Sequence, residues 1–179
     1  MIKTKYDLKK YLERDFNRYP KQKIPQIIRW LIRDEQTRIM HYLWVFRHTE
    51  YYKNINSPLF YFWYFWFCRL SNKLRVYLNL NSIGPGLRIV HIGGGVYLNA
   101  NIIGENFTTT TGVVIGKNKS NINRPSIGDN VEFTIGAKAY GNIYIGDNVI
   151  VAPNSVVIKS VENNCIVSGV PGIIIKRNI

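Results

Sequence analysis

The chain has 179 residues, enough for one compact unit or two small ones with a substantial buried core. Its two cysteines, Cys68 and Cys165, have no metal-ligand spacing, and they predict no disulfide framework. Residues 1–10 are charged rather than apolar, which argues against a signal peptide and predicts a cytoplasmic protein.

The formal net charge is +13, and most of it lies in the first half of the chain. Residues 1–82 hold 16 Lys and Arg against 6 Asp and Glu, a net charge of +10, whereas residues 83–179 hold 8 against 5. Solvated faces of amphipathic helices explain this surplus most simply. An anionic surface is the alternative, so contact with the inner face of the membrane stays open. No nucleic-acid-binding motif is found, and no nucleic-acid partner is predicted.

Residues 1–75 are predicted to form an α-helical N-terminal region. A charged amphipathic helix covers 6–16, a second begins at Pro25, and a third covers about 39–52. Ser57 and Pro58 then open a helix that is aromatic all round, over 60–67. The apolar run there is too short to span a membrane. Because water cannot surround such a helix, we expect it to pack against protein, with membrane contact as the alternative.

Residues 76–179 are predicted to form a parallel β-helix, because small or aliphatic residues recur at every sixth position. Neither an α-helix nor an ordinary strand has this period, but a β-helix coil has. At about 18 residues per triangular coil, 83–161 makes roughly four coils. One row of these positions is Ile127, Phe133, Ala139, Ile145, Val151 and Val157, and a second is Val131, Ala137, Ile143, Val149, Ser155 and Val161. Both rows should be buried.

The turns of the β-helix are predicted at glycine and asparagine, which tolerate left-handed backbone geometry. The expected positions are Gly84, Gly104, Gly116, Gly128, Gly146, Asn99, Asn101, Asn118, Asn142, Asn148 and Asn154. Ile83 and Ile89 are six residues apart, but the next position that fits the repeat is Tyr97, eight residues after Ile89. The two extra residues should bulge outward near 91–95. The segment 117–125 lacks apolar stacking residues and is predicted to leave the coil, carrying Lys117, Lys119 and Arg124.

His91 is the best candidate for a catalytic group, because it lies in the glycine-rich bulge. A histidine there is suited to act as a general base near neutral pH, although spacing alone is equally compatible with an ordinary surface histidine. His41 and His48 lie in the helical region and are interpreted as structural. Three scattered histidines do not predict a metal site, and a zinc-dependent anhydrase is disfavoured.

Five motifs stand out in the second region, 76–179. They are Ile83-Gly-Pro-Gly-Leu-Arg-Ile-Val-His91-Ile-Gly-Gly-Gly-Val, Thr111-Gly-Val-Val-Ile-Gly116, Ser126-Ile-Gly-Asp-Asn-Val131, Asn154-Ser-Val-Val-Ile-Lys159 and Val167-Ser-Gly-Val-Pro-Gly172 with the following Ile-Ile-Ile-Lys176. Together they resemble the serine acetyltransferase-like branch of the hexapeptide-repeat acyltransferases. The resemblance covers about 77–179 strongly. The preceding helices match more loosely, mainly in Phe46-Arg47.

The resemblance implies a homotrimer of left-handed β-helices, with acetyl-CoA as co-substrate and no metal. It implies direct acetyl transfer to a hydroxyl, with His91 as the base. Ile135 and Pro153 match family positions that face the pantetheine arm. Lys159 and Lys176 are candidates to offset the nucleotide phosphates by charge.

Departures from the family pattern decide the predicted acceptor. The family has aspartates one and fifteen residues before the histidine, where this chain has Val90 and Val76, and its Arg-His-Pro reads Asn123-Arg124-Pro125. Since the anion for an amino-acid ammonium is missing there, the primary prediction is an O-acetyltransferase acting on a sugar or oligosaccharide in surface polysaccharide biosynthesis. Serine O-acetyltransfer in cysteine biosynthesis is the alternative, and a non-catalytic scaffold is a third hypothesis. Asp34, Glu35, Glu50 or a backbone carbonyl would then orient His91.

Overall fold

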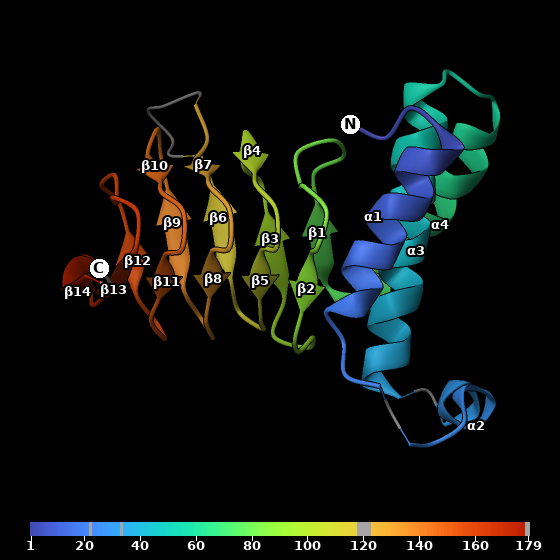
Figure 1. Ribbon diagram of the computed structural model, residues 1–179, viewed down its shortest axis with the longest axis horizontal. Coiled ribbons are helices and arrows are strands. Elements are labelled where there is room, and N and C mark those ends of the chain that lie inside the picture. Colours follow the sequence, from blue (N-terminus) through green and yellow to red (C-terminus); the bar gives the residue numbers. More distant parts are fainter. Residues whose placement is uncertain (22, 33, 118–122, 178–179) are drawn as a thin grey trace.

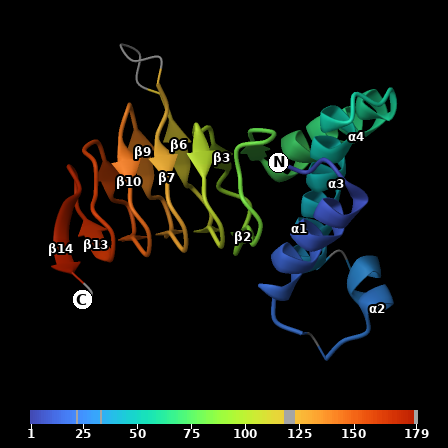
Figure 2. The same cartoon turned by 45° about the horizontal axis from the view of Figure 1, so that its top comes forward.

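In a computed structural model, which describes residues 1–21, 23–32, 34–117 and 123–177, a helical region lies at one end of a β-helix (Figure 1). The helices are α1 (Lys5–Asn17), α2 (Gln26–Leu31), α3 (Glu35–Asn54) and α4 (Leu59–Leu74). In Figure 1, α2 lies at the side away from the coils. The view in Figure 2 likewise places the helices near β2 and far from β13 and β14. The strands of the β-helix begin directly after α4, at Val76.

The strands form three sheets, one for each side of the β-helix. Sheet A contains β1 (Val76–Leu78), β3 (Val96–Leu98), β6 (Val114–Gly116), β9 (Lys138–Tyr140) and β12 (Val156–Val157). Sheet B contains β4 (Ile102–Ile103), β7 (Ser126–Ile127) and β10 (Tyr144–Ile145). Sheet C contains β2 (Arg88–Ile89), β5 (Thr108–Thr109), β8 (Glu132–Phe133), β11 (Ile150–Val151), β13 (Cys165–Ser168) and β14 (Ile173–Arg177).

Successive coils pair in parallel within each sheet, and the final β13–β14 pair is antiparallel. The predicted fold class, a left-handed parallel β-helix preceded by a short helical region, is confirmed. Both predicted rows are buried, with exposed fractions between 0% and 8%. The residues of these rows therefore stack coil on coil in one continuous core.

The register prediction at Tyr97 is wrong. Its neighbours Val96 and Leu98 are buried, whereas Tyr97 is 43% exposed and stacks on Tyr77 of the preceding coil, with ring centroids 4.8 Å apart. Leu98, not Tyr97, pairs with Ile115 of the next coil. The insertion after β2 is therefore longer than the six-residue count predicts.

Two of the three corners are columns of left-handed residues, one from each coil. The column between sheets C and A contains Arg75, Gly95, Gly112, Gly136, Asn154 and Gly169, and the column between sheets B and C contains Gly86, Asn106, Asn130, Asn148 and Asn164. Side-chain amides link the second column, with each Nδ2 donating to the Oδ1 of the next asparagine from Asn106 to Asn164. Asn106 and its successors thus terminate the turns and bond to each other.

The turn prediction is right for Asn148 and Asn154 and wrong for Asn99, Asn101 and Asn142, whose φ angles are not left-handed. Asn118 lies outside the described residues. The prediction of left-handed φ is also wrong for Gly84, Gly104, Gly116, Gly128 and Gly146. At all of these except Gly116, the neighbouring coil leaves no room for a Cβ. A Cβ at Gly128, for example, would lie 2.2 Å from Asp147 Oδ1 and 3.0 Å from the Asp147 backbone nitrogen. Glycine is required there because the neighbouring coil approaches too closely for a side chain.

A buried guanidinium joins the helices to the first coil. Arg47 of α3 is fully buried and uses all five of its N–H donors. Asp15 of α1 accepts from Nε at 2.8 Å and from Nη2 at 3.3 Å, and Glu50 accepts from Nη1 at 2.8 Å. The carbonyls of Ile83 and Gly84 accept the remaining two bonds, at 2.9 and 2.8 Å. One side chain therefore fixes α1, α3 and the first coil together.

Two side chains from α1 and the residues just after it also bind the backbone of the first coil. Asp15 Oδ1 accepts from the backbone N–H groups of Gly86 and Leu87, at 2.7 and 2.8 Å. Tyr19, just beyond α1, donates its hydroxyl to the Ile89 carbonyl at 3.2 Å and accepts from the Ile89 N–H at 2.9 Å. Because β2 is the edge strand of sheet C, this hydroxyl satisfies backbone groups that have no neighbouring strand.

Helix α4 is covered on one side only. Phe67, Ser71 and Leu74 are buried, and Phe67 packs against Tyr42 of α3 with ring centroids 5.8 Å apart. Tyr61 and Phe65 are 76% and 60% exposed. Burial against protein, as expected from the sequence, thus holds for one face within this chain. In the part of the chain that the structure describes, no helix is long and apolar enough to cross a membrane.

We expect Ile145→Lys to destabilise the β-helix by several kcal/mol, because Ile145 is fully buried and the ammonium would lie unpaired in the core. The matched control is Tyr144→Lys, next to it on β10, where the side chain is 52% exposed. Urea unfolding followed by circular dichroism measures both. Equal midpoints for Ile145→Lys and the parent protein would contradict the register.

We expect Arg47→Met to cost about 3–5 kcal/mol in unfolding free energy, because Asp15 and Glu50 would remain buried without a counter-charge. The control is Arg14→Met, which breaks a partly exposed pair with Glu105 and should cost about 1 kcal/mol or less. Guanidinium unfolding curves compare the two variants. A small loss for Arg47→Met would show that the ion network is not needed to join helices and coil.

Candidate active site

His91 lies where the chain leaves β2 at the corner between sheets C and A, and its side chain is 64% exposed. The glycine-rich segment follows directly. Gly93 has φ +121°, and nothing lies within 4 Å of the place where its Cβ would be, so the surface there is open. The Gly94 N–H donates to Thr111 Oγ1 of the next coil at 2.7 Å. The segment is thus held at one end while it leaves space beside the histidine.

Glu35 at the start of α3 contacts this histidine. Its Oε2 lies 3.0 Å from His91 Nδ1, and its Oε1 accepts from the backbone N–H of Ile92 at 2.9 Å. With Nδ1–H donating to the carboxylate, Nε2 is the unprotonated nitrogen of the neutral ring and faces away from Glu35. Partial burial raises the pKa of Glu35, but the bonds from Ile92 and His91 outweigh it and hold this pKa below its usual value. Glu35 is therefore an anion at neutral pH.

The other two carboxylates that the sequence offered are occupied elsewhere. Asp34 caps α3 through the Thr37 N–H and pairs with Arg29. Glu50 is bound by Arg47 and by the Asn81 N–H. Of the three, Glu35 is the one beside His91. Sequence reasoning named it as a candidate but had no signal to select it, because 56 positions separate the two residues.

A cavity of about 260 Å³ adjoins the His91–Glu35 pair. Glu35 and Arg38 of α3 line it, together with Lys73 near the end of α4, Arg75, and Gly93 of the glycine-rich segment. Three elements that are far apart in the sequence therefore meet there. The lining carries three cations and one carboxylate, so the cavity suits an anionic group.

Ile135 and Pro153 lie on the same corner as the glycine-rich segment. The backbone of this corner is linked from coil to coil, because Gly112 donates to Gly95, Gly136 to Thr111, and Asn154 to Ile135, at 2.7, 3.1 and 2.9 Å. Ile135 is 51% exposed, and Pro153 is also exposed. His91, Ile135 and Pro153 therefore follow one edge of the β-helix.

Lys159, Lys176 and Arg124 lie elsewhere in the chain. Lys159 follows β12 at the corner between sheets A and B, which is also where Arg124 lies, its carbonyl bonded to Asn101. Lys176 is on β14, opposite Ile166. Of the cations predicted for segment 117–125, Lys119 lies outside the described residues. Within one chain, these cations are not brought to His91.

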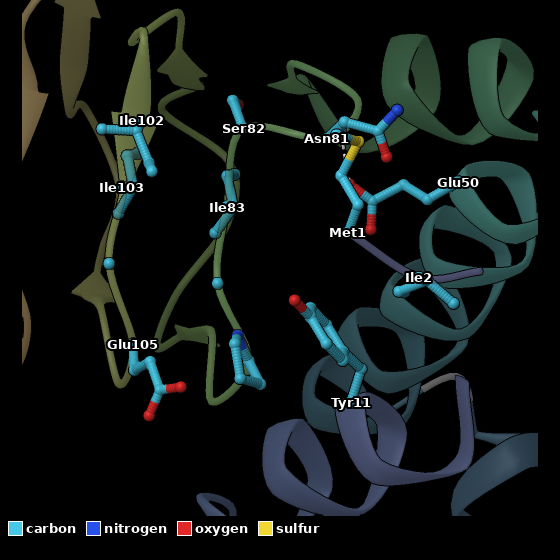
Figure 3. Close-up of a pocket in the computed structure, with 13 residues that line it drawn as sticks. Met1, Ile2, Tyr11, Glu50, Asn81, Ser82, Ile83, Ile102, Ile103 and Glu105 are labelled. Carbon is cyan, nitrogen blue, oxygen red and sulfur yellow. Dashed lines mark hydrogen bonds between the residues drawn. The ribbon is translucent and has the colours of Figure 1, made fainter. Parts of the chain in front are cut away.

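A second cavity, of about 230 Å³, lies at the junction of the helices and the first coils (Figure 3). Tyr11, Glu50 and Met1 approach it from the helical region, with Ile83 and Glu105 on the other side. It contains no histidine. His48 stacks on Trp63 instead, with ring centroids 4.6 Å apart. Among the described residues, no three His, Cys, Asp or Glu side chains are grouped to hold a metal ion.

Comparison with known proteins gives two kinds of likeness. A serine acetyltransferase of Staphylococcus aureus (strain Mu50) is 42% identical over 99 residues, and one of Staphylococcus epidermidis (strain RP62A) is 43% identical over the same length. Each match covers 54% of this chain and 46% of the relative, so the chain spans about half the length of these relatives. No family model matches the sequence.

Two solved structures share the fold. Serine acetyltransferase of Neisseria gonorrhoeae, in complex with serine, superposes with a TM-score of 0.74 at 23% identity, covering 96% of this chain and 70% of that one. The enzyme of Brucella abortus in complex with coenzyme A gives 0.69 at 24% identity, covering 95% and 66%. The fold is that of the hexapeptide-repeat acyltransferases. The predicted resemblance to the serine acetyltransferase-like branch is confirmed.

The primary prediction of the acceptor is wrong. The curated relatives are serine acetyltransferases, which overturns the reading as a sugar O-acetyltransferase of polysaccharide biosynthesis and favours the alternative. The prediction rested on the missing carboxylates at Val76 and Val90. Glu35 of α3 supplies a carboxylate beside His91. The residues near His91 in the sequence do not indicate this carboxylate.

Proposed function

We propose that the chain is a serine O-acetyltransferase that uses acetyl-CoA. The observation that carries this proposal is the 42% identity to serine acetyltransferases over 99 residues. The His91–Glu35 pair at an open corner of the β-helix supports it, because a histidine with a free ring nitrogen is suited to take the proton of an acceptor hydroxyl.

His91 is the proposed general base. Its Nε2 takes the proton of the acceptor hydroxyl while the hydroxyl oxygen attacks the thioester carbonyl carbon of acetyl-CoA. Collapse of the tetrahedral intermediate breaks the C–S bond and releases the CoA thiolate. The imidazolium then returns its proton to that sulfur, so His91 ends the cycle neutral. The products are O-acetylserine and CoA.

Glu35 is the proposed positioning residue. Its bond to Nδ1 keeps the tautomer in which Nε2 is free, and its negative charge stabilises the imidazolium that forms during transfer. The second oxygen of the same carboxylate is held by the Ile92 N–H, which fixes the carboxylate relative to the histidine. An anion from α3 thus replaces the orienting aspartate that the sequence lacks.

Ile135 and Pro153 are the proposed contacts for the pantetheine arm, because both are exposed along the edge that leads to His91. Lys159 and Lys176 are proposed to offset the phosphates of acetyl-CoA. Since Lys159 lies at a different corner, it would reach a molecule on that edge from a neighbouring subunit. We therefore place acetyl-CoA between subunits of the homotrimer that the resemblance implies.

We expect the purified protein to release CoA thiol from acetyl-CoA when L-serine is present, and His91→Ala to lower kcat by about 100-fold or more, because the base is removed. A thiol-reactive chromophore measures the release. The matched control is His41→Ala, an exposed histidine of α3 away from this corner, which should retain parent activity. Turnover of L-serine by His91→Ala at the parent rate would refute the assigned base.

We expect Glu35→Gln to lower kcat for L-serine by roughly 10-fold or more with a smaller change in KM for acetyl-CoA, because the amide keeps an acceptor for Nδ1–H but lacks the charge that stabilises imidazolium. Steady-state kinetics over a range of pH tests this, since loss of the charge should also move the pH profile. Glu13→Gln, an exposed carboxylate on α1, is the control. An unchanged kcat and pH profile would remove Glu35 from the mechanism.

A further inference from the structure

The cavity beside Glu35 is lined by more cationic than anionic side chains. Arg38, Lys73 and Arg75 line it against the single Glu35, which already accepts from His91 and Ile92. Within the residues that the structure describes, no hydrogen bond or ion pair to a side chain engages these three cations. Their charge is therefore available to a ligand.

Arg75 occupies a position that does not favour arginine. Its φ of 56° makes it the first member of the left-handed column between sheets C and A, whose other members are all glycine or asparagine. A left-handed residue with a long side chain is uncommon, since glycine or asparagine fits this conformation at lower cost. Arg75 precedes Gly95 by one coil in this column and lines the cavity. The N–H of Val96, next to Gly95, donates to the Arg75 carbonyl at 2.8 Å.

Both the size and the charges of the cavity match a small zwitterion. Its volume of about 260 Å³ lies just below the range of about 300–1,000 Å³ that is typical of sites for drug-sized ligands. A carboxylate among Arg38, Lys73 and Arg75 would accept charge-assisted hydrogen bonds. Each oxygen of Glu35 has a further lone pair for an ammonium group. Glu35 connects this cavity to the histidine, because its Oε2 lies 3.0 Å from His91 Nδ1.

We propose that Arg38, Lys73 and Arg75 bind the carboxylate of the acceptor and make the site specific for a hydroxyl-bearing α-amino acid over a neutral or cationic alcohol. This inference rests on the proposed function. It assigns acceptor recognition to the helical region and to the residue that follows it, whereas Arg124 at another corner takes no part within the chain.

The test compares L-serine with serinol (2-amino-1,3-propanediol), which keeps the ammonium and hydroxyl but has no carboxylate. Arg38→Gln retains a helix-forming residue, and Arg75→Asn retains left-handed geometry because Asn154 occupies the same column. Each variant should lower kcat/KM for L-serine about 10-fold or more through KM, and change kcat/KM for serinol by less than about twofold. The matched control is Lys53→Gln, an exposed cation of α3 outside this cavity.

The outcomes separate the two proposals. Equal losses on L-serine and serinol would show a general structural role and overturn the inference, and so would variants that lose nothing on L-serine. In both cases the parent protein still acetylates L-serine, so the proposed function survives. Parent protein that acetylates serinol but not L-serine, or neither, would overturn the proposed function and the inference with it.

Discussion

The guanidinium of Arg47, a single fully buried group, joins the helical region to the β-helix. Taking this charge out of water is costly, and the cost is offset only because two carboxylates and two backbone carbonyls accept all five of its N–H groups. Those acceptors belong to α1, α3 and the first coil. Each of these elements therefore has its best partners only when the other two are in place.

This junction sets the position of the site at a distance. Arg47 lies about 18 Å along α3 from Glu35, at 1.5 Å per residue. A continuous helix transmits the position of one end to the other, so anchoring α3 at Arg47 places Glu35 against His91 and Ile92. Tyr19 and Asp15 hold the strand and turn that lead to His91 from the other side. Helices and coil thus define the geometry of the histidine together.

The regular corners of the β-helix explain why the proposed site is at its first coil. Farther along, glycine or asparagine takes the left-handed position between sheets C and A, and the coils repeat with little variation. At the first coil the repeat meets α4, the column begins with Arg75, and the glycine-rich segment departs from the six-residue phase. Charged side chains can gather there because the stack of coils ends. The first coil therefore differs from the regular coils that follow it, and this difference makes room for the charged side chains.

The amino-acid sequence was enough to predict the solenoid, because a six-residue period of small and aliphatic residues satisfies one packing geometry. It also indicated His91 as a candidate through the glycines beside it. Both signals are local. It misplaced Tyr97 and several turn residues, since a one-residue shift changes which side chain faces the core without changing the composition. It also misjudged the acceptor, because the positions one and fifteen residues before the histidine hold valine, and nothing in the sequence selected Glu35 among the carboxylates of the helical region. Glu35, Arg38 and Arg75 reach the site only through packing of α3 and α4 on the first coil, and Coulomb interactions depend on distance in space rather than in sequence. Which charges surround His91 was therefore decided by the tertiary structure alone.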